Sequence, residues 1–195
     1  TSPWTTLSPM SNARGGLGLA VVAGKIYAIG GTNGNSVLNI VEEYNPSTDK
    51  WTLKTPMPTS RTSFAIASYD NKIYVIGGSI GDSFTSNVEV YDPATDSWEL
   101  KASMPTPSSD LSANVVDGSI YLIGGKVYAS TAPYYSESSK NQVYDIATNT
   151  WTTNASLTSA VQGYASTIVD KKIYIIGGSK VLSTSGALKP LSPKS

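Results

Sequence analysis

The sequence predicts an all-β protein of the β-propeller class, and three observations carry this prediction. The four tryptophans of the chain are 47, 47 and 53 residues apart: Trp4, Trp51, Trp98 and Trp151. The same landmark residues recur in the same order in each interval. Each interval also contains short β-prone runs separated by turn residues, without a sustained helical period. A four-stranded unit repeated at this length is typical of a propeller blade, in which radial packing buries both sheet faces.

The second unit shows the expected strands in order. We predict them at residues 62–69, 72–76, 86–91 and 98–101. Asp70-Asn71 is a tight hairpin turn between the first two strands (a and b), and Asp92-Pro93 begins the turn between the last two (c and d). Apolar residues alternate with polar ones in the third strand, as expected when its two faces have different surroundings.

Two further landmarks are assigned to structure in every unit. A Gly-Gly doublet closes strand b, where the backbone must bend or approach a neighbour closely. A tyrosine near the end of strand c precedes the next tryptophan by seven residues. Every blade needs the same core and only one place needs a ligand, so we interpret the repeated residues as structural. Besides the four tryptophans they are Gly30, Gly31, Gly77, Gly78, Gly124, Gly125, Gly177, Gly178, Tyr44, Tyr91 and Tyr144.

The order of these landmarks resembles the kelch motif. In the first unit it reads Trp…Pro-Met…Arg…Ile-Tyr-x-Ile-Gly-Gly…Val-Glu-x-Tyr-x-Pro-x-Thr-x-x-Trp, and the resemblance covers residues 4–178. It implies a kelch-type propeller, with a repeat array over residues 1–180 and a tail or linker over residues 181–195. The copies depart from the motif where Ser108 and Val161 replace the arginine, and the fourth unit lacks the Tyr…Trp ending.

The repeat count predicts three complete blades and one blade split between the termini. Kelch-type rings commonly close with a strand from one terminus, so residues 4–10 are expected to complete the blade that contains Ile173. An open four-blade arc would leave an apolar face in water at each end, which costs on the order of 10 kcal/mol at about 25 cal/mol/Å². We therefore expect additional blades, a second chain or self-association to cover these faces, with a closed four-blade ring as the remaining alternative.

Composition excludes several functional classes. The chain has 195 residues, a formal net charge of zero, no cysteine and no histidine. It therefore cannot build a Ser-His-Asp triad, a thiol nucleophile or an imidazole metal site. No basic run suggests a nucleic-acid partner, and no apolar stretch is long enough for a membrane span. We expect no catalytic residues, no metal and no cofactor.

Composition also suggests where the protein acts. Charged residues make up 14% of the chain, and its loops are rich in Ser, Thr, Gly, Asn and Tyr. Such loops are common on exported β-proteins, so we expect an extracellular or cell-surface location and a prokaryotic source. The chain starts at Thr1 without Met, which suggests processing or excision.

One face of the predicted propeller collects the candidate binding residues. Because strands alternate in direction, the d–a loops between units and the b–c loops within units share this face. Arg14 and Arg61 lie in d–a loops, and the kelch resemblance implies that arginines here line the channel mouth and hold acidic partners. A guanidinium suits carboxylates through two-point contacts. The alternative is that both arginines brace contacts between blades. Ser108 and Gln162 are the matching wall residues of later units.

The third unit carries a six-residue insertion in its b–c loop, at residues 126–140. It contains Tyr128, Tyr134 and Tyr135. Insertions in repeat proteins tend to lie on the binding face, and tyrosine-rich loops supply rigid amphipathic contact surface. These tyrosines are therefore candidate partner contacts, with a drifted surface loop as the alternative.

These observations favour a non-catalytic interaction module that binds a protein or glycan partner on the face of the d–a and b–c loops. Two alternatives stay open. One is a segment of a kelch propeller enzyme that acts on sugar acids, similar to a sialic-acid isomerase, with Arg14 or Arg61 gripping a carboxylate. The other is a structural scaffold in a cell-surface protein, because a fold by itself does not fix a function.

Overall fold

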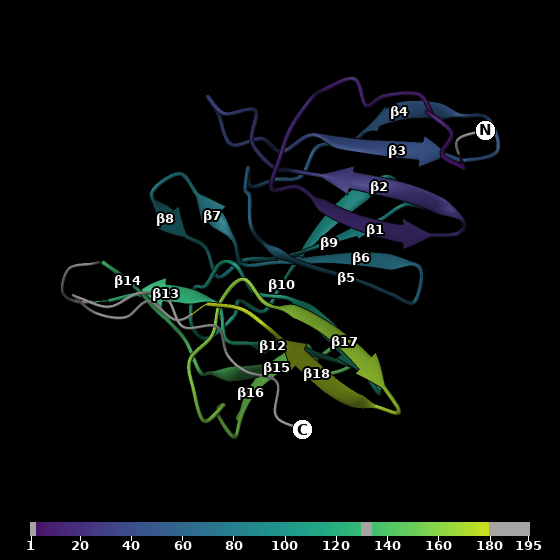
Figure 1. Ribbon diagram of the computed structural model, residues 1–195. Coiled ribbons are helices and arrows are strands. Elements are labelled where there is room, and N and C mark those ends of the chain that lie inside the picture. Colours follow the sequence, from purple (N-terminus) through teal and green to yellow (C-terminus); the bar gives the residue numbers. More distant parts are fainter. Residues whose placement is uncertain (1–2, 130–133, 180–195) are drawn as a thin grey trace.

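The computed structural model describes residues 3–129 and 134–179, and the tail predicted at residues 181–195 lies outside this range. The described residues form eighteen strands and no helix (Figure 1). No segment of the described chain is therefore a helix long and apolar enough to cross a membrane. The all-β prediction is confirmed.

Three four-stranded antiparallel sheets form the complete blades. In each sheet, strands a to d lie in sequence order from one edge to the other. The first blade consists of β1 (Gly18–Val22), β2 (Lys25–Ile29), β3 (Val41–Asn45) and β4 (Lys50–Lys54). The second consists of β5 (Ala65–Tyr69), β6 (Lys72–Ile76), β9 (Val88–Asp92) and β10 (Ser97–Lys101). The third consists of β11 (Ala113–Val116), β12 (Ser119–Ile123), β15 (Asn141–Asp145) and β16 (Thr150–Asn154).

The remaining strands are hairpins. β17 (Ala165–Val169) and β18 (Lys172–Ile176) are strands a and b of the fourth unit. Two smaller hairpins lie within b–c loops. In the second blade, β7 (Ser79–Ile80) pairs with β8 (Ser83–Phe84), and in the third, β13 (Lys126–Tyr128) pairs with β14 (Tyr135–Glu137). Figure 1 shows both small hairpins on one side of the molecule, away from the turns that join strands a and b.

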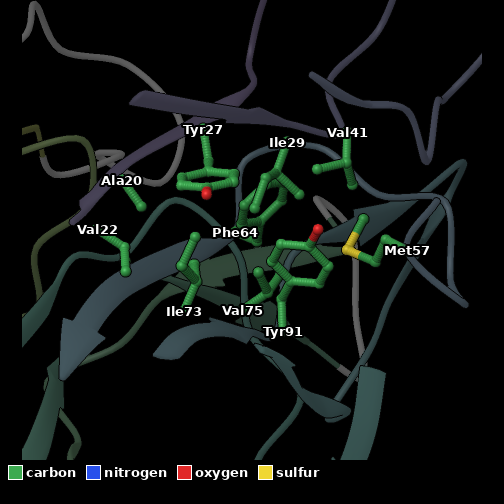
Figure 2. Close-up of a cluster of buried hydrophobic side chains, with 10 residues drawn as sticks. All are labelled: Ala20, Val22, Tyr27, Ile29, Val41, Met57, Phe64, Ile73, Val75 and Tyr91. Atoms are coloured by element: carbon green, nitrogen blue, oxygen red, sulfur yellow. The ribbon is translucent and has the colours of Figure 1, made fainter. Parts of the chain in front are cut away.

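The hydrophobic core lies between neighbouring blades. One buried cluster combines Tyr27, Ile29 and Val41 of the first blade with Ile73 and Tyr91 of the second. Figure 2 shows these side chains facing each other from the two sheets. A second buried cluster joins the second and third blades in the same way. Each complete blade thus buries a sheet face against its neighbour, which is the main stabilising contribution expected for a propeller.

The Gly-Gly doublets mark close approaches between successive units. Gly77 has φ +66°, and a Cβ built there would lie 2.6 Å from the carbonyl oxygen of Ser108. The next residue, Gly78, donates its N–H to the same carbonyl at 2.8 Å. The doublets of the first and third units make the same bond to the carbonyls of Arg61 and Val161. The repeated doublet is thus required because only glycine permits this backbone to lie against the next unit.

A polar junction joins each complete blade to the segment that precedes it. In the second blade, the Asp96 carboxylate accepts hydrogen bonds from the Tyr91 hydroxyl and the Thr55 N–H, and Trp98 Nε1 donates to the Thr55 carbonyl at 3.0 Å. Trp98 also stacks at a tilt on Tyr91, with ring centroids 5.0 Å apart. The Tyr91 hydroxyl is the main cause that holds the pKa of Asp96 below its usual value.

The other two complete blades repeat this junction. In the first, Asp49 accepts from Tyr44 and from the Ser8 N–H, and in the third, Asn149 accepts from Tyr144 and from the Ala102 N–H. The corresponding indole groups of Trp51 and Trp151 donate to the carbonyls of Ser8 and Ala102. These tryptophans are half-buried at the blade junctions, so they are structural without lying in the deep core.

Trp4 differs from the other tryptophans because its side chain is largely exposed. The indole groups of the other three are half-buried and donate to carbonyls of the segment that precedes their blade. Trp4 is therefore not buried at a blade junction, and its structural role stays a prediction.

The two ends of the array do not join as expected. Residues 4–10 form no strand, and within the described residues β18 pairs only with β17. Ser8 instead lies against Asp49 and Trp51 of the first blade. The blades follow one another in an arc, with β17 at one end and β1 at the other (Figure 1). The N-terminal segment therefore lies with its own neighbouring blade, and the expected completion of the fourth blade by residues 4–10 is not observed.

Candidate functional site

The face formed by the d–a and b–c loops is held together by backbone hydrogen bonds. In every unit the d–a loop forms a β-bridge to the residue that follows the Gly-Gly doublet: Gly15 with Thr32, Thr62 with Ser79, Ser109 with Lys126, and Gln162 with Ser179. This repeated bridge confirms that the two kinds of loop share one face. It also fixes the base from which the b–c hairpins extend.

The two b–c hairpins meet in a cluster of aromatic rings. Phe84 of β8 lies 4.8 Å from Tyr128 and 5.3 Å from Tyr135, measured between ring centroids. Tyr128 and Tyr135 face each other across the β13–β14 hairpin at 5.6 Å. These separations place the rings in mutual contact. We call Phe84, Tyr128 and Tyr135 the aromatic cluster.

Hydrogen bonds from the tyrosines fix the cluster to the neighbouring blade. Both hydroxyls donate to the carbonyl of Asp82, at 2.5 Å from Tyr128 and 3.4 Å from Tyr135. Asp82 lies in the turn between β7 and β8. Although anchored in this way, Tyr128 and Tyr135 keep 46% and 41% of their surface exposed. The third predicted tyrosine, Tyr134, precedes β14 and is also exposed.

The charges beside the cluster are mainly acidic. Asp82 is exposed, and within the described residues no salt bridge involves its carboxylate. Glu137 ends the β14 strand and accepts a hydrogen bond from Gln162 Nε2 at 3.3 Å. The ammonium of Lys126 pairs with Asp110 at 3.1 Å. The exposed aromatic surface therefore has an acidic rim.

The two candidate arginines are placed differently. Arg14 pairs with Glu42 of β3 and donates to the Ala28 carbonyl at 2.9 Å. Arg61 pairs with Glu89 of β9 at 2.7 Å and donates to two backbone carbonyls of its blade. Both arginine side chains are fully buried. Burial lowers the pKa of Arg61, and the Glu89 carboxylate opposes this shift. As placed, neither guanidinium offers exposed surface to a partner, and each one ties its d–a loop to the blade that follows that loop.

The third unit replaces the whole ion pair with neutral residues. Ser108 stands at the arginine position and is buried, with its hydroxyl donating to the Thr106 carbonyl at 2.9 Å. Gln142 stands at the position of Glu42 and Glu89, two residues before the strand-c tyrosine, and accepts from the Thr106 N–H at 2.8 Å. The arginine and the glutamate thus change together, which avoids leaving one buried charge without its partner.

Gln162 is also nearly buried. Of the predicted contact residues, the structure thus brings Tyr128 and Tyr135 together on the surface and keeps Tyr134 exposed. Arg14, Arg61, Ser108 and Gln162 lie beneath the same face as internal polar groups.

Sequence reasoning missed two residues of the site, Phe84 and Asp82. The b–c loop of the second unit supplies one of the three rings and the carbonyl that accepts hydrogen bonds from the other two. A signal was present, because Phe84 is one of only two phenylalanines and lies in a loop that, apart from Ile80, consists of small and polar residues.

The described residues contain no group of three or more Asp or Glu side chains that could hold a metal ion. The chemistry available on this face is therefore that of aromatic surface, hydrogen-bonding backbone and a few charges.

Blades of this topology, stacked through their sheet faces, define a β-propeller repeat protein. The family model of the KLHDC2/KLHL20/DRC7 Kelch-repeats domain matches residues 16–188. The chain belongs to this kelch-repeat family, and the resemblance read from the sequence is confirmed.

Two known proteins show how far the similarity extends. The human influenza virus NS1A-binding protein is 54% identical over 43 residues, a stretch that covers 22% of this chain and 7% of that protein. The solved structure of YjhT superposes with a TM-score of 0.79 at 20% identity. That match covers 91% of this chain and 63% of the YjhT chain, and at this identity it shows the fold alone. The chain thus spans a small part of the first protein and less than two thirds of the second.

Proposed function

We propose that this chain is a non-catalytic kelch interaction module that binds a protein partner on the face of the d–a and b–c loops. The observation that carries the proposal is the aromatic cluster, whose two tyrosines are exposed although hydrogen bonds and ring contacts order the cluster across two blades. A rigid aromatic surface contributes contact area at low entropic cost on binding, and such residues are enriched in binding hot spots.

Kelch family membership supports the same function. The matching human protein carries in its name that it binds another protein. In this chain, the residues that repeat in every blade hold blades together, whereas the two b–c hairpins differ from the repeat and face solvent. The surface that distinguishes the copies is thus available for recognition.

The test is site-specific photo-crosslinking in an extract of the cells that produce the protein. A benzophenone amino acid replaces Tyr134 on the proposed face in one sample and Tyr69 in the other. Tyr69 is a matched control because it is 39% exposed and ends β5 at the a–b turn, on the opposite face. We expect crosslinked protein from position 134 and none from position 69. Equal crosslinking from both positions, or none from position 134, would contradict the proposal.

The sugar-acid enzyme alternative has a weaker basis. It requires Arg14 or Arg61 to meet a substrate carboxylate, and each guanidinium already meets a glutamate in a buried pair. Incubation with N-acetylneuraminic acid, followed by NMR of the sugar, tests this alternative directly. We expect no change in the anomeric signals beyond the uncatalysed rate.

Extracellular or cell-surface location remains a prediction from composition, to be tested by fractionation of the source cells.

A further inference from the structure

We propose that the aromatic cluster recognises a basic, apolar protein segment, in which a large aliphatic side chain packs on the rings and a neighbouring Arg or Lys faces Asp82. This inference rests on the proposed function and names the chemistry of its partner. Arginines at the channel mouth, which the kelch resemblance implied, would instead select an acidic partner.

The ring geometry favours an aliphatic side chain. The three rings are tilted against each other by 35–41°, so no two of them form one flat platform for a sugar ring. Because the rings contact one another, the space between them is filled, and a ligand meets their outer faces and edges. A branched aliphatic side chain fits tilted faces of this kind and removes their exposed surface from water.

The hydrogen bonding disfavours a saccharide. Both cluster hydroxyls donate to the Asp82 carbonyl and are thus already engaged. A saccharide has many hydroxyls that lose water on binding, and each needs a replacement partner. The cluster offers few free donors to replace the hydrogen bonds that a saccharide makes with water. An apolar ligand gives up fewer such bonds when it binds.

The charges select a cation. Asp82 is exposed and its backbone carbonyl accepts both cluster hydroxyls, so its charge is close to the rings, and Glu137 lies in the adjoining hairpin. The one ammonium in these hairpins, Lys126, is paired with Asp110. A guanidinium or ammonium of the partner is attracted by the opposite charge of the Asp82 carboxylate. It also interacts favourably with the exposed tyrosine rings, because cations are attracted to aromatic faces.

The experiment titrates three blocked hexapeptides into the ¹⁵N-labelled chain and follows backbone amides by NMR. The probes alternate Leu with Arg, Leu with Glu, and Ser with Arg. We expect the Leu-Arg peptide to shift the amides of Asp82, Phe84, Tyr128 and Tyr135. The other two peptides should bind at least tenfold more weakly, because each lacks one of the two recognised features.

Variants separate the two contributions. Phe84→Leu keeps an apolar side chain between the hairpins and removes a ring, so we expect a several-fold loss of affinity. Asp82→Asn keeps the carbonyl that accepts both hydroxyls and removes the charge. A twofold to fivefold loss is expected, as for an exposed ion pair, together with a weaker dependence on salt. Tyr69→Ala removes a tyrosine that is 39% exposed on the opposite face, and it should leave the affinity for the Leu-Arg peptide unchanged.

Each outcome decides between the proposals. Tighter binding of the Leu-Glu peptide, or shifts of the same amides by N-acetylneuraminic acid alone, would overturn the basic partner and leave the binding face intact. Unaltered affinity in both Asp82→Asn and Phe84→Leu would also overturn it. Failure of the proposed function itself is recognised separately, by the absence of crosslinks from position 134.

Discussion

Arg61 and Glu89 show how a residue singled out by its sequence pattern can serve the fold. Both side chains are buried, and removing one charge leaves the other without compensation. We predict that Arg61→Ser or Glu89→Gln alone lowers the free energy of unfolding by about 3–5 kcal/mol. The double variant reproduces the neutral pair of the third blade, Ser108 and Gln142, and should cost clearly less than the sum. Urea denaturation of the four proteins measures this coupling, and additive losses would contradict it.

The junction carboxylates Asp49 and Asp96 make part of the stability depend on pH. Hydrogen bonds, from the tyrosine hydroxyl first, hold the pKa of each below its usual value. A carboxyl with a lowered pKa in the folded state stabilises the fold above its unfolded pKa of about 4, and this contribution is lost as the pH falls through the folded value. We predict that Asp49→Asn with Asp96→Asn flattens the decrease of Tm between pH 5 and pH 3.

The third junction is the natural control for this prediction. Asn149 accepts the same two hydrogen bonds without a charge, from Tyr144 and from the Ala102 N–H. The amide variants should therefore fold at neutral pH with a Tm within a few degrees of the wild type. Thermal unfolding at several pH values tests both statements, and an unchanged slope below pH 5 would mean that other carboxyls cause the acid sensitivity.

The role of a residue could be predicted from the sequence where the residue repeats in every unit. The role could not be predicted where it depends on a contact with a residue that is distant in the sequence. The doublets and the strand-c tyrosines repeat, and the structure uses them at every complete blade. Its d–a loop and the kelch resemblance made Arg61 a binding candidate, but Arg61 and Glu89 are both replaced in the third unit, and comparing the two positions indicates a pair. Phe84 could not be assigned, because its contacts with Tyr128 and Tyr135 cross between blades.

At the scale of the element, the glycine that ends strand b limits how closely two units pack. Gly77 and Gly24 both have positive φ, at +66° and +73°, so alanine strains both backbones to a similar extent. At Gly77 the added Cβ would also lie 2.6 Å from the Ser108 carbonyl, whereas at Gly24 nothing lies within 4 Å. We predict that Gly24→Ala costs about 1 kcal/mol and Gly77→Ala about 3 kcal/mol or more. Equal losses in urea denaturation would show that backbone strain alone matters.

Strands were predictable where alternation and turns agree, as in the second blade, whose strand b was placed correctly at residues 72–76. The segment at residues 4–10 has the tryptophan and the proline of a strand d but forms no strand. In the complete blades, strand d forms by pairing with strand c of the same sheet. The local sequence does not show whether such a partner strand lies next to the segment. The prediction that residues 4–10 complete the fourth blade failed for this reason.

At the scale of the whole molecule, both the propeller architecture and the apolar surface at the two ends of the array were predicted from the sequence. The expectation that an open arc exposes apolar surface agrees with the structure. Tyr174 and Ile176 of β18 are exposed, whereas Ile29 and Ile76, at the same position as Ile176 in complete blades, are fully buried. At the other end Leu19 and Val21 of β1 are exposed. What covers these residues depends on contacts outside the described chain, and the local pattern carries no information about them.

These exposed ends predict how the 195-residue chain behaves alone. Water-exposed sheet faces and the edge of β18 with which no described strand pairs favour association with a second copy. We therefore expect a molar mass above the 20.5 kDa of the monomer in sedimentation equilibrium at micromolar concentrations. Ile176→Lys should shift the chain toward the monomer, since it places a charge on the exposed face. Leu100→Lys is the matched control, because Leu100 is 65% exposed and Ile176 is 62% exposed, but Leu100 lies on strand β10 of the second blade, which has a neighbouring blade on each side. A wild-type monomer that unfolds cooperatively at every concentration would show that the apolar ends are stable in water, and the argument for further blades or a second chain would then fail.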